Sequence, residues 1–190
     1  MIICMSDFIC ITNRKLCREP FLERIKSVAE LKPKAIVLRE KYLDESEYIL
    51  LATDVLEIAE KYGVPIILHT FAGAAIRLGC DKIHMPLPAL RNMSDDDKKH
   101  FTVIGCSCHS VDEAVEAAHL GATYITAGHI FQTDCKKGVP PRGLDFLHDV
   151  CNAVSVPVYA IGGIKFSDID VLKSCGAAGG CIMSGFMAQK

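Results

Sequence analysis

Hydrophobic residues are grouped along this chain in eight short runs that are separated by amphipathic stretches. The runs are rich in β-branched residues and are apolar throughout rather than alternating, which is typical of strands buried on both faces of a parallel sheet. The predicted strands span residues 7–12, 35–38, 65–68, 82–84, 103–106, 124–126, 156–160 and 180–183.

Helical periodicity fills the longer intervals between these runs. The clearest predicted helices span residues 45–62, 110–120 and 167–174. The glycines that would end them are Gly63, Gly121 and Gly176. Ser110 and Glu113 have the spacing of a capping box, in which each residue satisfies a free backbone N–H of the first helical turn.

Eight strands with interleaved helices predict a compact (β/α)₈ TIM barrel, of class α/β, better than an open doubly wound sheet. No linker or low-complexity tract divides the sequence, so we expect one domain over residues 1–190. Few residues follow the eighth run, and the closing helix is therefore expected to be shortened.

Composition narrows the class of protein. Half of the 190 residues are hydrophobic and the formal net charge is −2, which argues against disorder and against a basic nucleic-acid-binding face. The N-terminal segment lacks the pattern of a signal peptide, and no apolar run approaches the ~20 residues of a membrane span. We expect a cytoplasmic protein that binds neither nucleic acid nor membrane.

The ten cysteines are interpreted as structural or incidental. Several lie inside apolar runs, where cysteine behaves as a small hydrophobic residue. There is no C-x-x-C pair, and the C-x-C formed by Cys106 and Cys108 has no further ligands at the spacing of a zinc site. We expect no metal and no cofactor.

Barrel active sites lie at the C-terminal ends of the strands. Arg39 and Lys41 follow the second run and would lie on one side of an extended segment, either as anion ligands or as an ordinary solvated turn. Ser107 follows the fifth run and is a candidate substrate or phosphate ligand, and His129 follows the sixth run. A histidine titrates near neutrality and could act as a general acid and base, although most histidines are structural.

Two glycine-containing turns predict a phosphate site. Gly162 and Gly163 follow the seventh strand, and Ser184 and Gly185 follow the eighth, where barrels often bind phosphate through backbone N–H groups. The alternative is that glycine serves only the geometry of a tight turn.

The loop after the sixth strand, residues 128–143, is the longest in the sequence. It contains Lys136 and Arg142, which could bind a phosphate or carboxylate by charge-assisted hydrogen bonds. A solvated basic loop is the alternative interpretation.

Taken together, these residues resemble the thiamine phosphate synthase and TenI superfamily over almost the whole chain. The resemblance rests on the LREK segment at residues 38–41, on Gly105-x-Ser107-x-His109-Ser110, on the AIGGI segment at residues 160–164, and on the final serine–glycine turn, all in the family's order. It implies the barrel fold and a phosphorylated small-molecule ligand.

The loop at residues 128–138, GHIFQTDCKKG, with Arg142 and Gly143 after it, is similar to TenI-type thiazole tautomerases. The synthases carry a P-T-x-T-K segment there, and they bind Mg²⁺ and a pyrimidine diphosphate with acidic residues after the third and fourth strands. Here His69-Thr70 and the segment 85–89 (MPLPA) stand in those places, and they are poor ligands for Mg²⁺.

The resemblance therefore implies a thiazole tautomerase that aromatises a carboxythiazole phosphate in thiamine biosynthesis without metal or cofactor. It assigns proton transfer to His129, anion binding to Lys136 and Arg142, and phosphate binding to the glycine turns. Two alternatives remain: thiamine phosphate synthase, a transferase, and a non-catalytic phosphometabolite-binding or regulatory protein. The roles of Glu40, His69 and His109 and the oligomeric state, a homo-oligomer included, stay open.

Overall fold

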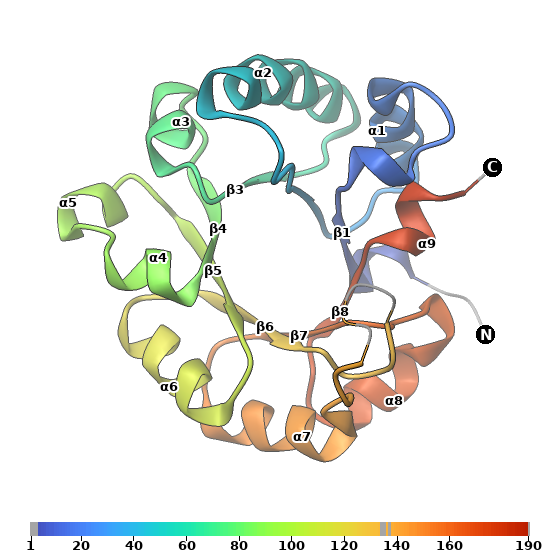
Figure 1. Cartoon of the computed structure of the whole chain (residues 1–190), viewed down its shortest axis with the longest axis vertical. Helices are drawn as coiled ribbons and strands as arrows, with labels where there is room; N and C mark the ends of the chain where they lie inside the picture. Colours follow the sequence, from blue (N-terminus) through green and yellow to red (C-terminus); the bar gives the residue numbers. More distant parts are fainter. Residues whose placement is uncertain (1–3, 134–135, 137, 190) are drawn as a thin grey trace.

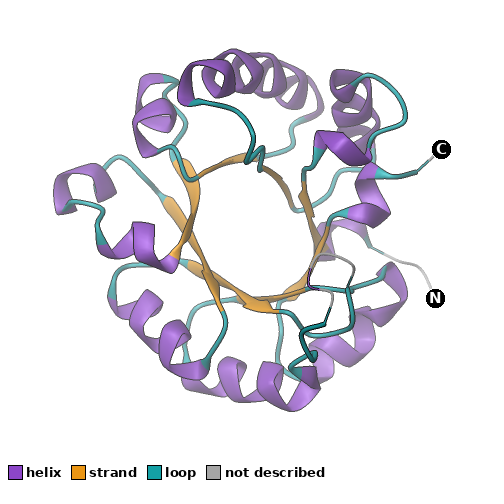
Figure 2. Ribbon diagram, viewed as in Figure 1, coloured by secondary structure: helices purple, strands orange, loops and turns teal. Residues whose placement is uncertain are grey.

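The computed structural model describes residues 4–133, 136 and 138–189 (Figure 1). Eight parallel strands form a closed barrel in the order β1-β2-β3-β4-β5-β6-β7-β8, and the helices surround it (Figure 2). The strands are β1 Phe8–Ile11, β2 Ala35–Leu38, β3 Ile66–His69, β4 Lys82–Pro86, β5 Val103–Cys108, β6 Tyr124–Gly128, β7 Val158–Ile161 and β8 Gly179–Ile182. The predicted TIM barrel is confirmed, and each predicted strand overlaps an observed one.

The helices follow the strands in the expected alternation. They are α1 Phe21–Glu30, α2 Glu45–Tyr62, α3 Ala72–Arg77, α4 Leu87–Arg91, α5 Asp95–Lys98, α6 Val111–His119, α7 Gly143–Ala153, α8 Ile169–Ser174 and α9 Ser184–Met187. Single 3₁₀ turns occupy Met5–Asp7, Arg14–Leu16 and Phe166–Asp168. The closing helix α9 has four residues, so the shortened C-terminal helix is confirmed.

Caps define the ends of the two best predicted helices. Asp44 and Glu47 form a complete capping box at the start of α2, and Gly63 ends that helix with a φ of 66°, a conformation that favours glycine. At α6, Ser110 Oγ accepts the N–H of Glu113 as predicted. The Glu113 carboxylate, however, accepts the N–H of His109 rather than that of Ser110, so only half of the predicted box forms.

The barrel separates two cores. The larger core lies between strands and helices, and the smaller one fills the interior with residues such as Ile9, Val37, Ile67, Tyr124 and Tyr159. Residues that point outward alternate with residues that point inward along each strand.

The expectation of strands that are apolar throughout is wrong for β4, β5 and β6. His84 is in register with Gly105, and Gly105 is in register with Tyr124, while Ser107 is in register with Thr126. The outward positions of these strands are apolar, whereas the polar side chains of His84, Ser107, Tyr124 and Thr126 occupy inward positions. The nine cysteines in the described part of the chain are free, and Cys106 and Cys108 are buried in the outer core.

No helix in the described part of the chain combines the length and the apolar character needed to cross a membrane.

Candidate active site

The C-terminal end of β2 supplies positive charge to the mouth of the barrel. The pKa of Lys41 lies below its ordinary value because of the charge of Arg39, then burial, then the charge of Lys136. These three predicted anion ligands, two from β2 and one from the β6–α7 loop, therefore lie close enough for their charges to interact. Such mutual repulsion favours binding of an anion among them.

Glu40, whose role the sequence left open, ties β1 to β2. Its side chain is buried, and Oε1 accepts hydrogen bonds from the Thr12 hydroxyl at 2.8 Å and from the Arg14 N–H at 3.1 Å. Burial raises the pKa of Glu40, and these hydrogen bonds oppose the shift. Thr12 Oγ1 also accepts the N–H of Arg39 at 2.9 Å. Glu40 thus fixes the segment that presents Arg39 and Lys41.

A polar cluster occupies the barrel interior below the ends of β4, β5 and β6. His84 Nδ1 lies 2.8 Å from the Tyr124 hydroxyl, and His84 Nε2 lies 2.7 Å from Ser107 Oγ. The Thr126 hydroxyl donates to Ser107 Oγ at 3.3 Å. Burial, and secondarily the charge of Arg39, lowers the pKa of His84 to about 3. His84 is therefore a neutral imidazole near neutral pH.

The neighbouring His69 stacks on His84 with ring centroids 5.6 Å apart. Burial is the largest cause that lowers the pKa of His69 to about 2, followed by the proximity of His84 and then the charges of Arg39 and Lys41. His69 Nδ1 lies 2.6 Å from the Thr70 hydroxyl. A cation at the ends of β3 and β4 would thus meet two neutral imidazoles and would be repelled by the positive charge of Arg39.

Sequence reasoning missed His84, Tyr124 and Thr126. The available signal was alternation: polar or small residues occupy every second position of three successive strands, and those positions share the barrel interior. The runs assigned to β4 and β6, residues 82–84 and 124–126, contain these three residues but are too short to show the alternation clearly.

His129 lies in the loop between β6 and α7, directly after a cis Gly128–His129 peptide bond. Its side chain is 4% exposed, and Nε2 lies 3.3 Å from the Val139 carbonyl. Because a carbonyl only accepts, Nε2 carries the proton and donates it. In the described part of the chain, the buried Nδ1 has no hydrogen-bond partner. His129 thus has one ring nitrogen, Nδ1, that no group in the described part of the chain engages.

His109 occupies a different position from His129. It is exposed at the end of β5, and its Nδ1–H donates to the Gly128 carbonyl at 2.9 Å. This contact joins the ends of β5 and β6 just before His129. The geometry favours a structural role for His109.

The β6–α7 loop lies against the ends of β7 and β8 (Figure 1). The N–H groups of Ile130 and Phe131 donate to the carbonyls of Ile161 and Gly162, both at 2.9 Å. A Cβ at Gly162 would overlap His129, and a Cβ at Gly163 would overlap the carbonyl of Gln132. Both glycines also have positive φ angles. Glycine is therefore needed at both positions, first of all, so that the β6–α7 loop can pack closely against them.

The second predicted turn also has a packing reason for its glycine. A Cβ at Gly185 would lie 2.7 Å from Ile182 Cγ2 and 3.3 Å from the ring of Phe166. Ser184 is exposed at the start of the four-residue helix α9. Phosphate binding at these two turns stays a prediction.

The predicted anion ligand Arg142 lies at the start of α7. Its guanidinium is 5.2 Å from the centroid of the Phe146 ring, and its backbone N–H donates to the His129 carbonyl at 2.9 Å. The Arg142 side chain thus packs along α7 against Phe146, while its backbone is hydrogen-bonded to His129. Asp134, Cys135 and Lys137, which contribute to the loop's family resemblance, lie outside the described residues.

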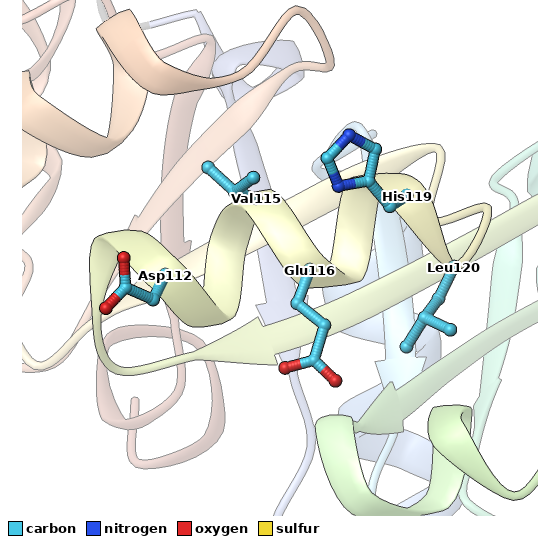
Figure 3. Close-up of a pocket in the computed structure, with 5 residues that line it drawn as sticks. All are labelled: Asp112, Val115, Glu116, His119 and Leu120. Atoms are coloured by element: carbon cyan, nitrogen blue, oxygen red, sulfur yellow. The ribbon is translucent and has the colours of Figure 1, made fainter.

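One surface hollow, of about 410 Å³, lies on the outer face of α6 (Figure 3). A second hollow of about 340 Å³ lies between α2 and the end of α3. Neither of these two hollows is lined by a predicted site residue. Within the described ranges, no three His, Cys, Asp or Glu side chains are grouped as metal ligands.

Comparison with known proteins identifies the family of this chain. The family model described as thiamine monophosphate synthase matches residues 8–186. A thiamine-phosphate synthase of Clostridium acetobutylicum is 32% identical over 191 residues, which cover 95% of this chain and 87% of the relative. A thiamine-phosphate synthase of Desulfitobacterium hafniense is 32% identical over 176 residues, covering 90% and 83%.

Among solved structures, a thiamine phosphate pyrophosphorylase from Pyrococcus furiosus superposes with a TM-score of 0.82 at 24% identity, covering 98% of this chain and 90% of that one. This structural likeness supports the barrel fold alone. The family and its place in metabolism rest on the family model and the sequence relatives. The chain belongs to the thiamine monophosphate synthase family and is an enzyme of thiamine biosynthesis.

Proposed function

We propose that this enzyme is a thiazole tautomerase that aromatises a carboxythiazole phosphate, with His129 as the proton carrier. One observation carries the proposal: His129 is a buried imidazole whose Nε2–H is engaged by the Val139 carbonyl and whose Nδ1 is unused in the described part of the chain. A base that gives and takes one proton requires such a free nitrogen, held in a fixed orientation.

The reaction balances without any co-reactant. His129 Nδ1 removes the proton from the ring carbon that bears the carboxylate. The released electron pair moves through the ring, and the exocyclic double bond takes up the same proton from the imidazolium. One C–H bond breaks, another forms, and the aromatic ring is the driving force. Since the side chain is 4% exposed, the β6–α7 loop must shift to admit the substrate to Nδ1.

The charged ends of the substrate match two parts of the site. Arg39, Lys41 and Lys136 would attract its anionic groups. Backbone N–H groups at Gly162-Gly163 and Ser184-Gly185 would bind the phosphate. In this scheme Arg142 contributes through the backbone hydrogen bond that holds His129 in place.

Thiamine phosphate synthesis is the second candidate, favoured by the names of the relatives and of the family model. Its Mg²⁺ diphosphate requires hard oxygen ligands. The ends of β3 and β4 instead present His69, Thr70 and Pro86, with His69 and His84 stacked beside them. This donor set fits a Mg²⁺ diphosphate poorly, which is why we rank the transferase second.

The test is a tautomerase assay on the purified protein, in which NMR follows the exocyclic carbon of the substrate. His129→Asn should slow aromatisation by roughly 10²–10⁴-fold, the usual contribution of a positioned proton carrier, and should leave product binding intact. His109→Asn is the matched control on the adjacent strand end and should have a milder effect.

A parallel assay with Mg²⁺, the pyrimidine diphosphate and thiazole phosphate measures thiamine phosphate. Metal-dependent coupling, with no aromatisation in the first assay, would establish the transferase. Ligand binding with neither activity would establish a binding protein.

A further inference from the structure

The chain of contacts Tyr124–His84–Ser107, here called the relay, has a defined place in the barrel. The three residues come from β6, β4 and β5 and lie on the interior side of those strands. Gly105 lies between His84 and Tyr124 in the register, and a Cβ there would overlap both rings. The absence of a side chain at position 105 therefore allows the imidazole and the phenol to meet.

The direction of the hydrogen bonds follows from the chemistry of the phenol. Within the described residues, the Tyr124 hydroxyl has one hydrogen-bond partner, His84 Nδ1. Tyr124 is 6% exposed, so its proton would be buried and unpaired unless it is donated to that nitrogen. Nδ1 is then the acceptor, and Nε2 carries the proton of the neutral imidazole and donates it to Ser107 Oγ.

The Ser107 hydroxyl consequently has one hydrogen-bonding capacity left, which is to donate its own proton. Its oxygen accepts hydrogen bonds from His84 Nε2–H and from the Thr126 hydroxyl, which occupy both lone pairs. Its own proton has no acceptor in the described part of the chain. Ser107 is half-buried at the end of β5, so this proton is available to a ligand in the mouth.

We propose that the relay fixes Ser107 as a hydrogen-bond donor to the substrate's ring carboxylate, with His84 and Tyr124 as positioning residues. The identity of this ligand group rests on the proposed function. The carboxylate is favoured over the phosphate because Ser107 is paired with β4 and β6 and does not lie at the turns predicted to bind phosphate. The predicted phosphate turns follow β7 and β8.

The polarity of the relay can be tested without any turnover. The ¹⁵N shifts of His84 in the unliganded protein should show the Nε2–H tautomer between pH 5 and 8, and Tyr124→Phe should shift the equilibrium toward a mixture. A predominant Nδ1–H tautomer in the unaltered protein would overturn the proposal, whether or not the enzyme is a tautomerase.

The role of Ser107 can be tested with two aromatic probes, the carboxythiazole phosphate and the same thiazole phosphate without the ring carboxylate. Calorimetric titration should show that Ser107→Ala weakens the first probe by roughly tenfold and leaves the second nearly unchanged. His84→Leu should reproduce this pattern, and His84→Gln, whose amide N–H can replace Nε2–H, should restore most of the affinity.

Equal losses for both probes would show that Ser107 binds the phosphate or is merely structural, and would overturn the proposal. Thermal unfolding of each variant identifies any that fails to fold, and Ser107→Ala, the smallest change, then decides the question. Normal turnover in His129→Asn would defeat the proposed proton carrier and leave these binding results standing.

Discussion

The two sides of the barrel mouth are built by different means. Beneath the ends of β4, β5 and β6, side chains form the polar surface, and hydrogen bonds among His84, Ser107 and Tyr124 hold them. At the ends of β7 and β8, backbone groups and glycines form the surface, and the β6–α7 loop packs directly on them. The first side can select a ligand by donor and acceptor pattern. The second can select one by shape and by exposed N–H groups.

On both sides of the mouth a glycine allows neighbouring groups to approach the strand or turn closely, but the kind of neighbouring group differs. At Gly105 the space is filled by the rings of Tyr124 and His84, and at Gly163 it is filled by the main chain of the loop that contains His129. A substitution at Gly163 therefore meets backbone, which moves only with the whole loop. The glycine side should be the more sensitive of the two.

The largest expected effect is that of Gly163→Ala on the free energy of unfolding, measured with urea. The matched control is Gly79→Ala, because φ is 71° at Gly163 and 65° at Gly79, and an added Cβ at Gly79 meets nothing within 4 Å. Gly79→Ala should cost about 1–2 kcal/mol from the left-handed backbone alone. Gly163→Ala should cost about 2–5 kcal/mol, because overpacking adds to that strain.

Similar losses in the two variants would show that the loop yields easily, and the difference between the two sides of the mouth would disappear. A loss confined to phosphate-ligand binding, with stability equal to that of Gly79→Ala, would instead support a glycine kept for the ligand.

The sequence predicted the barrel because buried strands and amphipathic helices leave strong periodic signals. It also selected Arg39, Lys41 and Lys136, whose charges do interact across the mouth. The packing role of Gly162 and Gly163 was not visible, because it depends on a loop that is distant in sequence order but adjacent in space. For the same reason a glycine motif alone cannot distinguish a phosphate cradle from a tight contact.

The side of the mouth that contains His84 should make the stability of the protein sensitive to acid. The pKa of His84 is about 3 in the folded protein and near the ordinary ~6.5 when unfolded, so below ~6.5 the unfolded chain binds the extra proton. Stability should be complete above this pH and fall as the pH drops, by about 1.4 kcal/mol per pH unit from His84 alone. His69 contributes with the same sign.

Glu40 acts in the opposite direction, because its raised pKa lets the folded state bind a proton more readily, between its ordinary value and the raised one. Urea unfolding of the unaltered protein and of His84→Gln between pH 4.5 and 7.5 measures the slope. The variant should lose about one proton's worth of pH dependence, whereas the control His100→Gln, at an exposed position, should keep the full slope. An unchanged slope in His84→Gln would mean that the relay is not a buried neutral site.

The smallest expected effect concerns the link between the cationic segment after β2 and the loop that covers the glycine side. The charge of Lys136 is one of the causes that lower the pKa of Lys41, after the charge of Arg39 and burial. Lys136→Ala should therefore raise the pKa of Lys41 modestly, because one repelling charge is removed while the larger causes remain. Titration of ¹³C-methylated lysines by NMR follows the Lys41 resonance directly. Lys99→Ala, which removes an exposed lysine paired with Asp96 on α5, is the control and should leave Lys41 unchanged. If Lys136→Ala also leaves it unchanged, the loop does not bring its charge to the β2 side in solution, and the two sides of the mouth bind their anions independently.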